Sequence, residues 1–124
     1  MIQYGIVLVC LKNLLTSGRD LKAMKYNIPS KVRIANHWYK VILCDFIDNG
    51  DTFGSHCNLR LEIKVAECMK NDDGETIYLT EEQIKNSFWH EMFHAFNYYY
   101  NNKQDESLAQ TFANFMREYE LTRE

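Results

Sequence analysis

The amino-acid sequence predicts an α+β domain, in which a small, mainly antiparallel sheet packs against C-terminal helices. Short apolar runs separated by turn residues occupy residues 29–80, and two longer segments with helical spacing follow them. The chain has 124 residues and 46% apolar content, enough to bury one core. We therefore expect a single domain over residues 25–124 and an N-terminal extension over residues 1–24.

The extension is separated from the rest by Thr16-Ser17-Gly18, and Met24 to Pro29 resembles the natural beginning of a domain. Met24 is therefore a candidate functional start. The apolar run Ile6–Leu11 lacks a preceding basic region and is interrupted by Lys12, which argues against a secretion signal.

The sheet is predicted from β-rich runs between Pro29 and Thr80. A turn is expected at residues 48–51, and a three-residue connection at residues 35–37 joins the first two strands as a hairpin. The expected strands are Lys31–Ile34, Trp38–Cys44, Thr52–Cys57 and Leu59–Val65. Thr76–Leu79 is either a further short strand or simply the approach to the helix cap.

The first helix should begin near Glu81, because Thr80 and Gln83 have the spacing of a capping box. Its apolar residues recur at helical spacing and predict a core-facing stripe. That stripe comprises Ile84, Phe88, Met92, Ala95 and Tyr99, and a polar stripe beside it comprises Ser87, His90, His94 and Asn97.

A short polar connection leads into a second helix, expected over residues 105–121. Glu106 shares a stripe with Ala109 and Ala113. Small side chains there would let the two helices approach closely, so that the Glu106 carboxylate could reach the first helix.

The most informative motif is His90-Glu91-x-x-His94 within the first helix. Residues four apart lie on one helix face, so both imidazoles can bind one metal ion, and Glu91 is the candidate general base. A catalytic zinc site needs a third protein ligand, for which Glu106 is the candidate and Asp105 the alternative. His94 lies well before the end of the first helical pattern, whereas Glu106 lies close to the start of the next helix. For the two side chains to meet, the first helix should end early, near Tyr98, or the connection should fold back.

The motif and the following Glu106-x-x-Ala109-x-x-Phe112-Ala113 resemble the metal-binding core of the ImmA/IrrE-type minimal gluzincin metallopeptidases, including small phage and bacterial HExxH proteins. The resemblance extends over roughly residues 31–120. It implies a zinc-dependent peptidase with a small sheet and a few helices, with His90, His94 and Glu106 as metal ligands and Glu91 as the base. The interval from His94 to Glu106 is shorter than in many gluzincins.

The other histidines and the tyrosines are weaker candidates. His37 is explained by its place in the hairpin connection, whereas His56, on a strand that could border the cleft, could support the site or its transition state. Tyr98, Tyr99 and Tyr100 could stabilise an oxyanion, but aromatic packing at a helix end explains each of them more simply.

Charge and cysteine content restrict the partners and the compartment. The net charge is −3 with no basic run, so nucleic-acid binding lacks its electrostatic signature, and no apolar stretch is long enough to span a membrane. The four cysteines form no Cys-x-x-Cys pair. We expect Cys44 and Cys57 to be buried thiols in a reducing, cytoplasmic environment. The other two cysteines are Cys10 and Cys68.

The sequence thus predicts a Zn²⁺-dependent metallopeptidase acting on a peptide or protein, with a metal-activated water and Glu91 as the base. The substrate could add as a strand to an exposed sheet edge, for which residues 59–65 are the candidate. Two alternatives remain open, a catalytically silent zinc-binding interaction or regulatory module and a hydrolase of a non-peptide amide.

Overall fold

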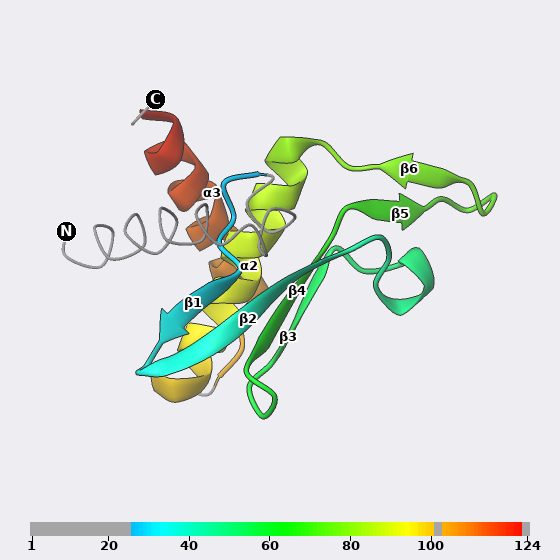
Figure 1. Ribbon diagram of the computed structural model, residues 1–124. Coiled ribbons are helices and arrows are strands. Elements are labelled where there is room, and N and C mark those ends of the chain that lie inside the picture. The colour runs from blue at the N-terminus through cyan, green and yellow to red at the C-terminus, as the bar shows by residue number, and fades with distance from the viewer. Residues whose placement is uncertain (1–25, 101–102, 123–124) are drawn as a thin grey trace, which may run out of the picture.

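A mixed four-stranded sheet carries two C-terminal helices on one face in this computed structural model, which describes residues 26–100 and 103–122 (Figure 1). The predicted extension over residues 1–24 lies outside the described residues. The elements are β1 (Lys31–Ile34), β2 (His37–Cys44), η1 (Asp48–Gly50), β3 (Gly54–Cys57), β4 (Glu62–Ala66), β5 (Cys68–Lys70), β6 (Thr76–Tyr78), α2 (Glu81–Tyr100) and α3 (Glu106–Thr122). The predicted α+β class is confirmed.

The sheet has the strand order β1-β2-β4-β3. Pairs β1–β2 and β3–β4 are antiparallel, whereas the central pair β2–β4 is parallel. The chain passes along the outer edge as β3 before β4 returns beside β2, which makes β2 and β4 run in the same direction. The expectation of a mainly antiparallel sheet therefore needs correction, because the centre of the sheet is parallel.

The first hairpin turns in two residues, not the expected three. Ala35 and Asn36 have φ values of 49° and 68°, the left-handed pair that a type I′ turn requires. Ile34 consequently pairs with His37, and β2 begins one residue before the predicted start.

The predicted strand at residues 59–65 is displaced and is not an edge. Leu59 is 92% exposed, and Leu61 has a φ of 56°, so regular pairing begins only at Glu62. The resulting β4 lies between β2 and β3 and cannot accept an added strand. The edges of this sheet are β1 and β3.

A separate two-stranded arm extends away from the helices (Figure 1). Residues Cys68–Lys70 pair with Thr76–Tyr78, so the short strand predicted before the helix cap exists and has a partner that the sequence pattern did not indicate. Ile77 and Tyr78 on this arm are exposed.

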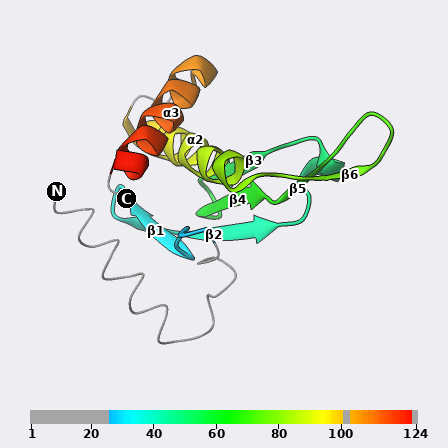
Figure 2. The same cartoon turned by 90° about the horizontal axis from the view of Figure 1, so that it is seen from above.

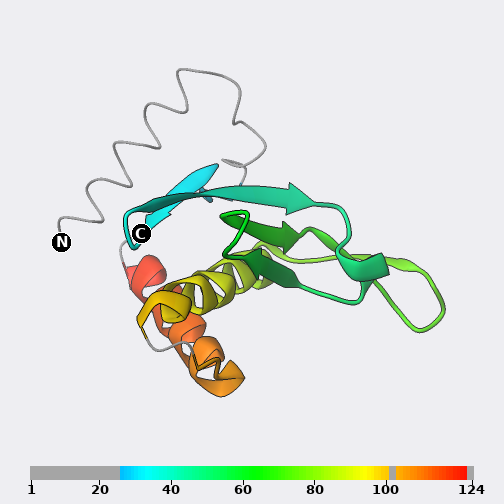
Figure 3. The same ribbon diagram turned by 90° about the horizontal axis from the view of Figure 1, so that it is seen from below.

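Helix α2 packs its apolar stripe against the sheet, and α3 packs on the other side of α2 (Figures 2 and 3). The capping box is confirmed, since Gln83 N donates to Thr80 Oγ1 (3.1 Å) and Thr80 N donates to Gln83 Oε1 (2.9 Å). The core combines α2 with alternate residues of the strands. It contains Ile84, Phe88 and Ala95 with Val32, Ile34, Tyr39, Val41, Leu43, Ile63 and Val65, and Met92 and Tyr99 pack at its margin.

Helix α3 begins at Glu106 because Asp105 is its N-cap. Leu108 N donates to Asp105 Oδ1 at 3.0 Å. Ala109 and Ala113 are fully buried, as expected for the stripe at which the helices meet. At the opposite end of the helix pair, the Arg117 guanidinium binds both carboxylate oxygens of Glu82.

No helix among the described residues combines the length and the apolar character needed to cross a bilayer. Cys68 is buried, whereas Cys44 and Cys57 are only half-buried. Burial of the latter two thiols was therefore predicted wrongly, because each lies at or next to a strand end.

Candidate metal centre

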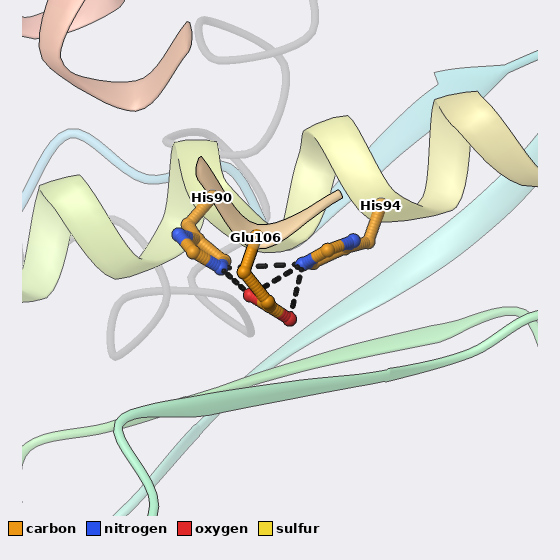
Figure 4. A group of neighbouring side chains, drawn as sticks. All are labelled: His90, His94 and Glu106. Carbon is orange, nitrogen blue, oxygen red and sulfur yellow. Dashed lines mark hydrogen bonds and ion pairs between the residues drawn. The ribbon is translucent and has the colours of Figure 1, made fainter. Parts of the chain in front are cut away.

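The side chains of His90, His94 and Glu106 converge on one point between α2 and α3 (Figure 4). The two Nε2 atoms are 3.2 Å apart. Glu106 Oε2 lies 2.8 Å from His90 Nε2, and Glu106 Oε1 lies 3.0 Å from His94 Nε2. The structure thus brings together all three residues that the sequence proposed as ligands.

The connection between the helices folds back to make this convergence possible. Helix α2 continues to Tyr100, so it does not end early. Asn97 Nδ2 donates to the Lys103 carbonyl, and Gln104 Nε2 donates to the His94 carbonyl at 3.3 Å. These bonds return the chain alongside α2, so that α3 begins beside His94.

Two glutamines orient the imidazoles. Gln104 Oε1 lies 2.6 Å from His94 Nδ1, and Gln110 Oε1 lies 3.0 Å from His90 Nδ1. The Gln104 amide orientation is fixed because its Nε2 donates to the His94 carbonyl. His94 Nδ1 then donates to Gln104 Oε1, which leaves His94 Nε2 directed at the point of convergence. Gln110 Nε2 donates to Asn86 and Asn114, so Gln110 Oε1 accepts from His90 Nδ1 in the same way.

This arrangement suits a cation at its centre. Two Nε2 lone pairs and a carboxylate directed at one point repel one another, and a bound cation would relieve that repulsion. Hydrogen bonding with His90, followed by that with His94, lowers the pKa of Glu106 below its usual value. The carboxylate is therefore ionised at neutral pH and suited to a cation.

The spacing of the donor atoms is close to that around a small tetrahedral metal ion, of which zinc is one. Two ligands that are each about 2.0–2.1 Å from one tetrahedral ion lie about 3.3 Å apart. The corresponding separations are 3.2 Å for the two nitrogens and 2.8 to 3.1 Å for the nitrogen–oxygen pairs. Two imidazoles and one carboxylate form the donor set of catalytic zinc sites that keep a fourth position open.

Glu91 lies on the neighbouring face of α2, in the same cleft as the three ligands. The cleft has a volume of about 880 Å³ and runs between β3 and the two helices. Glu91 Oε1 is 2.9 Å from His56 Nδ1 on β3. No hydrogen bond joins Oε2 to another of the described residues, and the Glu91 side chain is 11% exposed.

No protein-family model, curated protein or solved structure matches this chain. The interpretation of the site therefore depends on its own geometry, and the family resemblance remains a prediction.

The other candidates are placed away from the point of convergence, with one exception. The Asp105 carboxylate caps α3, so it is not the third ligand. Tyr99 Oη lies 2.5 Å from Tyr39 Oη and its ring stacks on His37, while Tyr100 stacks on Phe96 and Tyr98 packs on Tyr99. None of these tyrosines lines the cleft. The exception is His56.

Three contributors were missed by reasoning from the sequence. Gln104 and Gln110 orient the ligands, and Gly54 packs against Glu91. The spacing of Gln110, four residues after Glu106 on the same helix, was a usable signal. No comparable signal existed for Gly54, because its role depends on which strand lies opposite α2.

Proposed function

We propose that this chain is a zinc-dependent metallopeptidase. The observation that carries the proposal is the placement of Glu91 in one cleft with three convergent metal-ligand side chains. A site that only stored or structurally used zinc would need four protein ligands and no adjacent carboxylate. Three donors beside a carboxylate that lines the same cleft favour catalysis.

His90, His94 and Glu106 would hold the ion. When bound, zinc lowers the pKa of water and polarises a substrate carbonyl. The glutamines on the two Nδ1 atoms keep the imidazoles in the tautomer that such binding needs.

Glu91 is the general base of this proposal. Its Oε1 is held by His56, so Oε2 takes the proton from the attacking water. As the carbon–nitrogen bond breaks, the same oxygen returns the proton to the leaving amine, which makes Glu91 a base and then an acid.

In this proposal the sheet edge that binds the substrate is β3, and not residues 59–65 as expected from the sequence. β3 is a sheet edge, and Gly54, Ser55 and His56 line the cleft. An extended peptide could pair with this edge and present its scissile carbonyl to the site. This arrangement favours a peptide over a small non-peptide amide, which would gain nothing from a strand edge.

The ligand order also supports the resemblance to the minimal gluzincins. In this chain the third ligand comes from the helix that follows the motif, after a connection that folds back. Membership of that family, and an origin among its phage or bacterial members, stay part of the proposal.

The test is Glu91→Gln, which keeps the shape of the side chain but removes the base. We expect one zinc per chain by metal analysis and a loss of about 10²- to 10⁴-fold in cleavage of a quenched-fluorescent peptide library. Glu118→Gln, an identical change at an exposed position of α3, is the matched control and should retain wild-type activity.

Unchanged cleavage by Glu91→Gln would exclude Glu91 as the base. If the zinc-loaded wild type cleaves no peptide in the library, the silent zinc-binding module becomes the better description. Cleavage of simple acylated amides alone would support the non-peptide hydrolase.

A further inference from the structure

The edge strand β3 meets the Glu91 carboxylate at two points. His56 lies 2.9 Å from Glu91 Oε1 through its Nδ1 atom. Gly54, two residues earlier on the same face of the strand, lies directly against the Glu91 side chain. Both contacts join segments that are distant in the sequence.

His56 is the partner that a buried carboxylate needs. The Glu91 side chain is 11% exposed and that of His56 is 25% exposed. Within residues 26–100 and 103–122, His56 is the one hydrogen-bond partner of this carboxylate. An ionised carboxylate removed from water is costly without such a donor, and the donor also fixes which of the two oxygens is engaged.

Gly54 is needed for the close approach of the strand. A Cβ atom at this position would lie 2.9 Å from Glu91 Cγ and 3.4 Å from Glu91 Oε2. It would also lie 3.2 Å from the Lys64 carbonyl oxygen, which belongs to the backbone and cannot move aside alone. A side chain at Gly54 would therefore displace Glu91.

The sheet register sets the positions of both residues. Gly54 pairs with Val65, and His56 pairs with Ile63. Val65 and Ile63 are fully buried in the core, which fixes the position of β4. The hydrogen bonds between β3 and β4 therefore resist any slip of β3 along its partner. The His56 ring also stacks on the His94 ring, with centroids 5.2 Å apart and an interplanar angle of 14°.

We propose that His56 and Gly54 are positioning residues, which hold the Glu91 carboxylate so that Oε2 faces the reacting water. This inference rests on the proposed role of Glu91 as the general base. His56 acts through Glu91, since its Nδ1 is engaged with that carboxylate. The contribution should appear in kcat and not in KM, because the held carboxylate matters once the substrate is bound.

Two variants of His56 separate its hydrogen bond from its ring. His56→Asn keeps an N–H donor near the place of Nδ1 but loses the stacking ring, whereas His56→Phe keeps a ring and loses the donor. We expect His56→Phe to lower kcat on the quenched-fluorescent peptide library about 10- to 100-fold, at unchanged KM and zinc content. His56→Asn should recover most of that loss.

Gly54→Ala tests the second contact. We expect it also to lower kcat with zinc retained, because the added methyl group displaces Glu91. Thr76→Ala, at an exposed position of β6 outside the cleft, is the control and should retain the wild-type kcat. An equally active Gly54→Ala protein would overturn the role of Gly54.

A measurement that needs neither metal nor turnover tests the hydrogen bond itself. Nitrogen-15 NMR of the histidine rings should show the His56 proton on Nδ1 in the wild type and on Nε2 in Glu91→Ala. A wild-type His56 without a proton on Nδ1 would overturn the proposal.

The outcomes distinguish this inference from the proposed function. If Glu91→Gln remains active, the peptidase mechanism fails. If Glu91→Gln is inactive while His56→Phe is as active as the wild type, only the positioning role fails.

Discussion

The two halves of the candidate site are built from different parts of the chain. The metal half, His90, His94 and Glu106, comes entirely from α2 and α3. The base half joins Glu91 of α2 to the edge strand β3. On that strand, His56 precedes Glu91 by 35 residues in the sequence. The first half depends on helix packing and the second on sheet register.

The difference determines how each half is supported. In the metal half, Gln110 belongs to α3 and Gln104 to the connection that joins the two ligand-bearing helices. In the base half, the supporting contacts cross from a helix to a sheet. Changes in α3 should therefore affect metal binding, whereas changes in β3 should affect turnover without loss of metal.

The largest expected effect is the loss of metal on removal of the third ligand. Glu106→Ala should lower zinc affinity by more than about a hundredfold, which exceeds the usual effect of an outer partner. With two protein donors left, the ion would not be held at one per chain. Competition titration against a chromogenic chelator measures the affinity.

Asp105→Ala is the matched control for that change. Loss of the N-cap should destabilise α3 by about 1 kcal/mol while zinc stays bound. If Asp105→Ala loses zinc and Glu106→Ala retains it, the ligand assignment is reversed.

A smaller effect is expected when an orienting side chain is removed. Gln104→Ala should weaken zinc binding about 10- to 100-fold, because His94 Nδ1 loses its acceptor and the connection loses its bond to the His94 carbonyl. The same chelator titration applies. Gln83→Ala should show the opposite behaviour, with a lower melting temperature from the lost cap and unchanged zinc affinity.

The metal half could be predicted from the sequence for a physical reason. His90 and His94 are related by helical periodicity, which acts over a few residues. Glu106 could be proposed because a short connection constrains where the next helix begins, and Ala109 and Ala113 indicated the face of contact.

The base half could not be predicted, because strand order is decided by tertiary packing. Apolar alternation suggested a strand that ends at Val65 but did not show that it would be central. Leu59 satisfies the alternation and is nevertheless in a turn, since Leu61 adopts a positive φ. His56 was therefore recognised as a candidate without its partner, and Gly54 was not recognised.

The smallest effect concerns the ion pair that joins the start of α2 to the end of α3. The hydrogen bond from Arg117 lowers the pKa of Glu82 below its ordinary value of 4.5. A carboxyl whose pKa is lower in the folded than in the unfolded state stabilises the fold at pH values above its unfolded-state pKa. This contribution is lost as the pH falls through the pKa of the folded state. Arg117→Met should therefore cost about 1 kcal/mol at neutral pH, a modest value because the Glu82 side chain is 57% exposed.

The cost of Arg117→Met should shrink in acid, once Glu82 is protonated in both proteins. Urea unfolding at several pH values, with a chelator present throughout, measures this difference without any contribution from metal release. Arg33→Met removes a guanidinium that lies over the Trp38 ring and has no carboxylate partner within residues 26–100 and 103–122, so it should give a difference that does not vary with pH. A pH-independent cost for Arg117→Met would mean that packing of its buried stem, and not the ion pair, ties the two helices together.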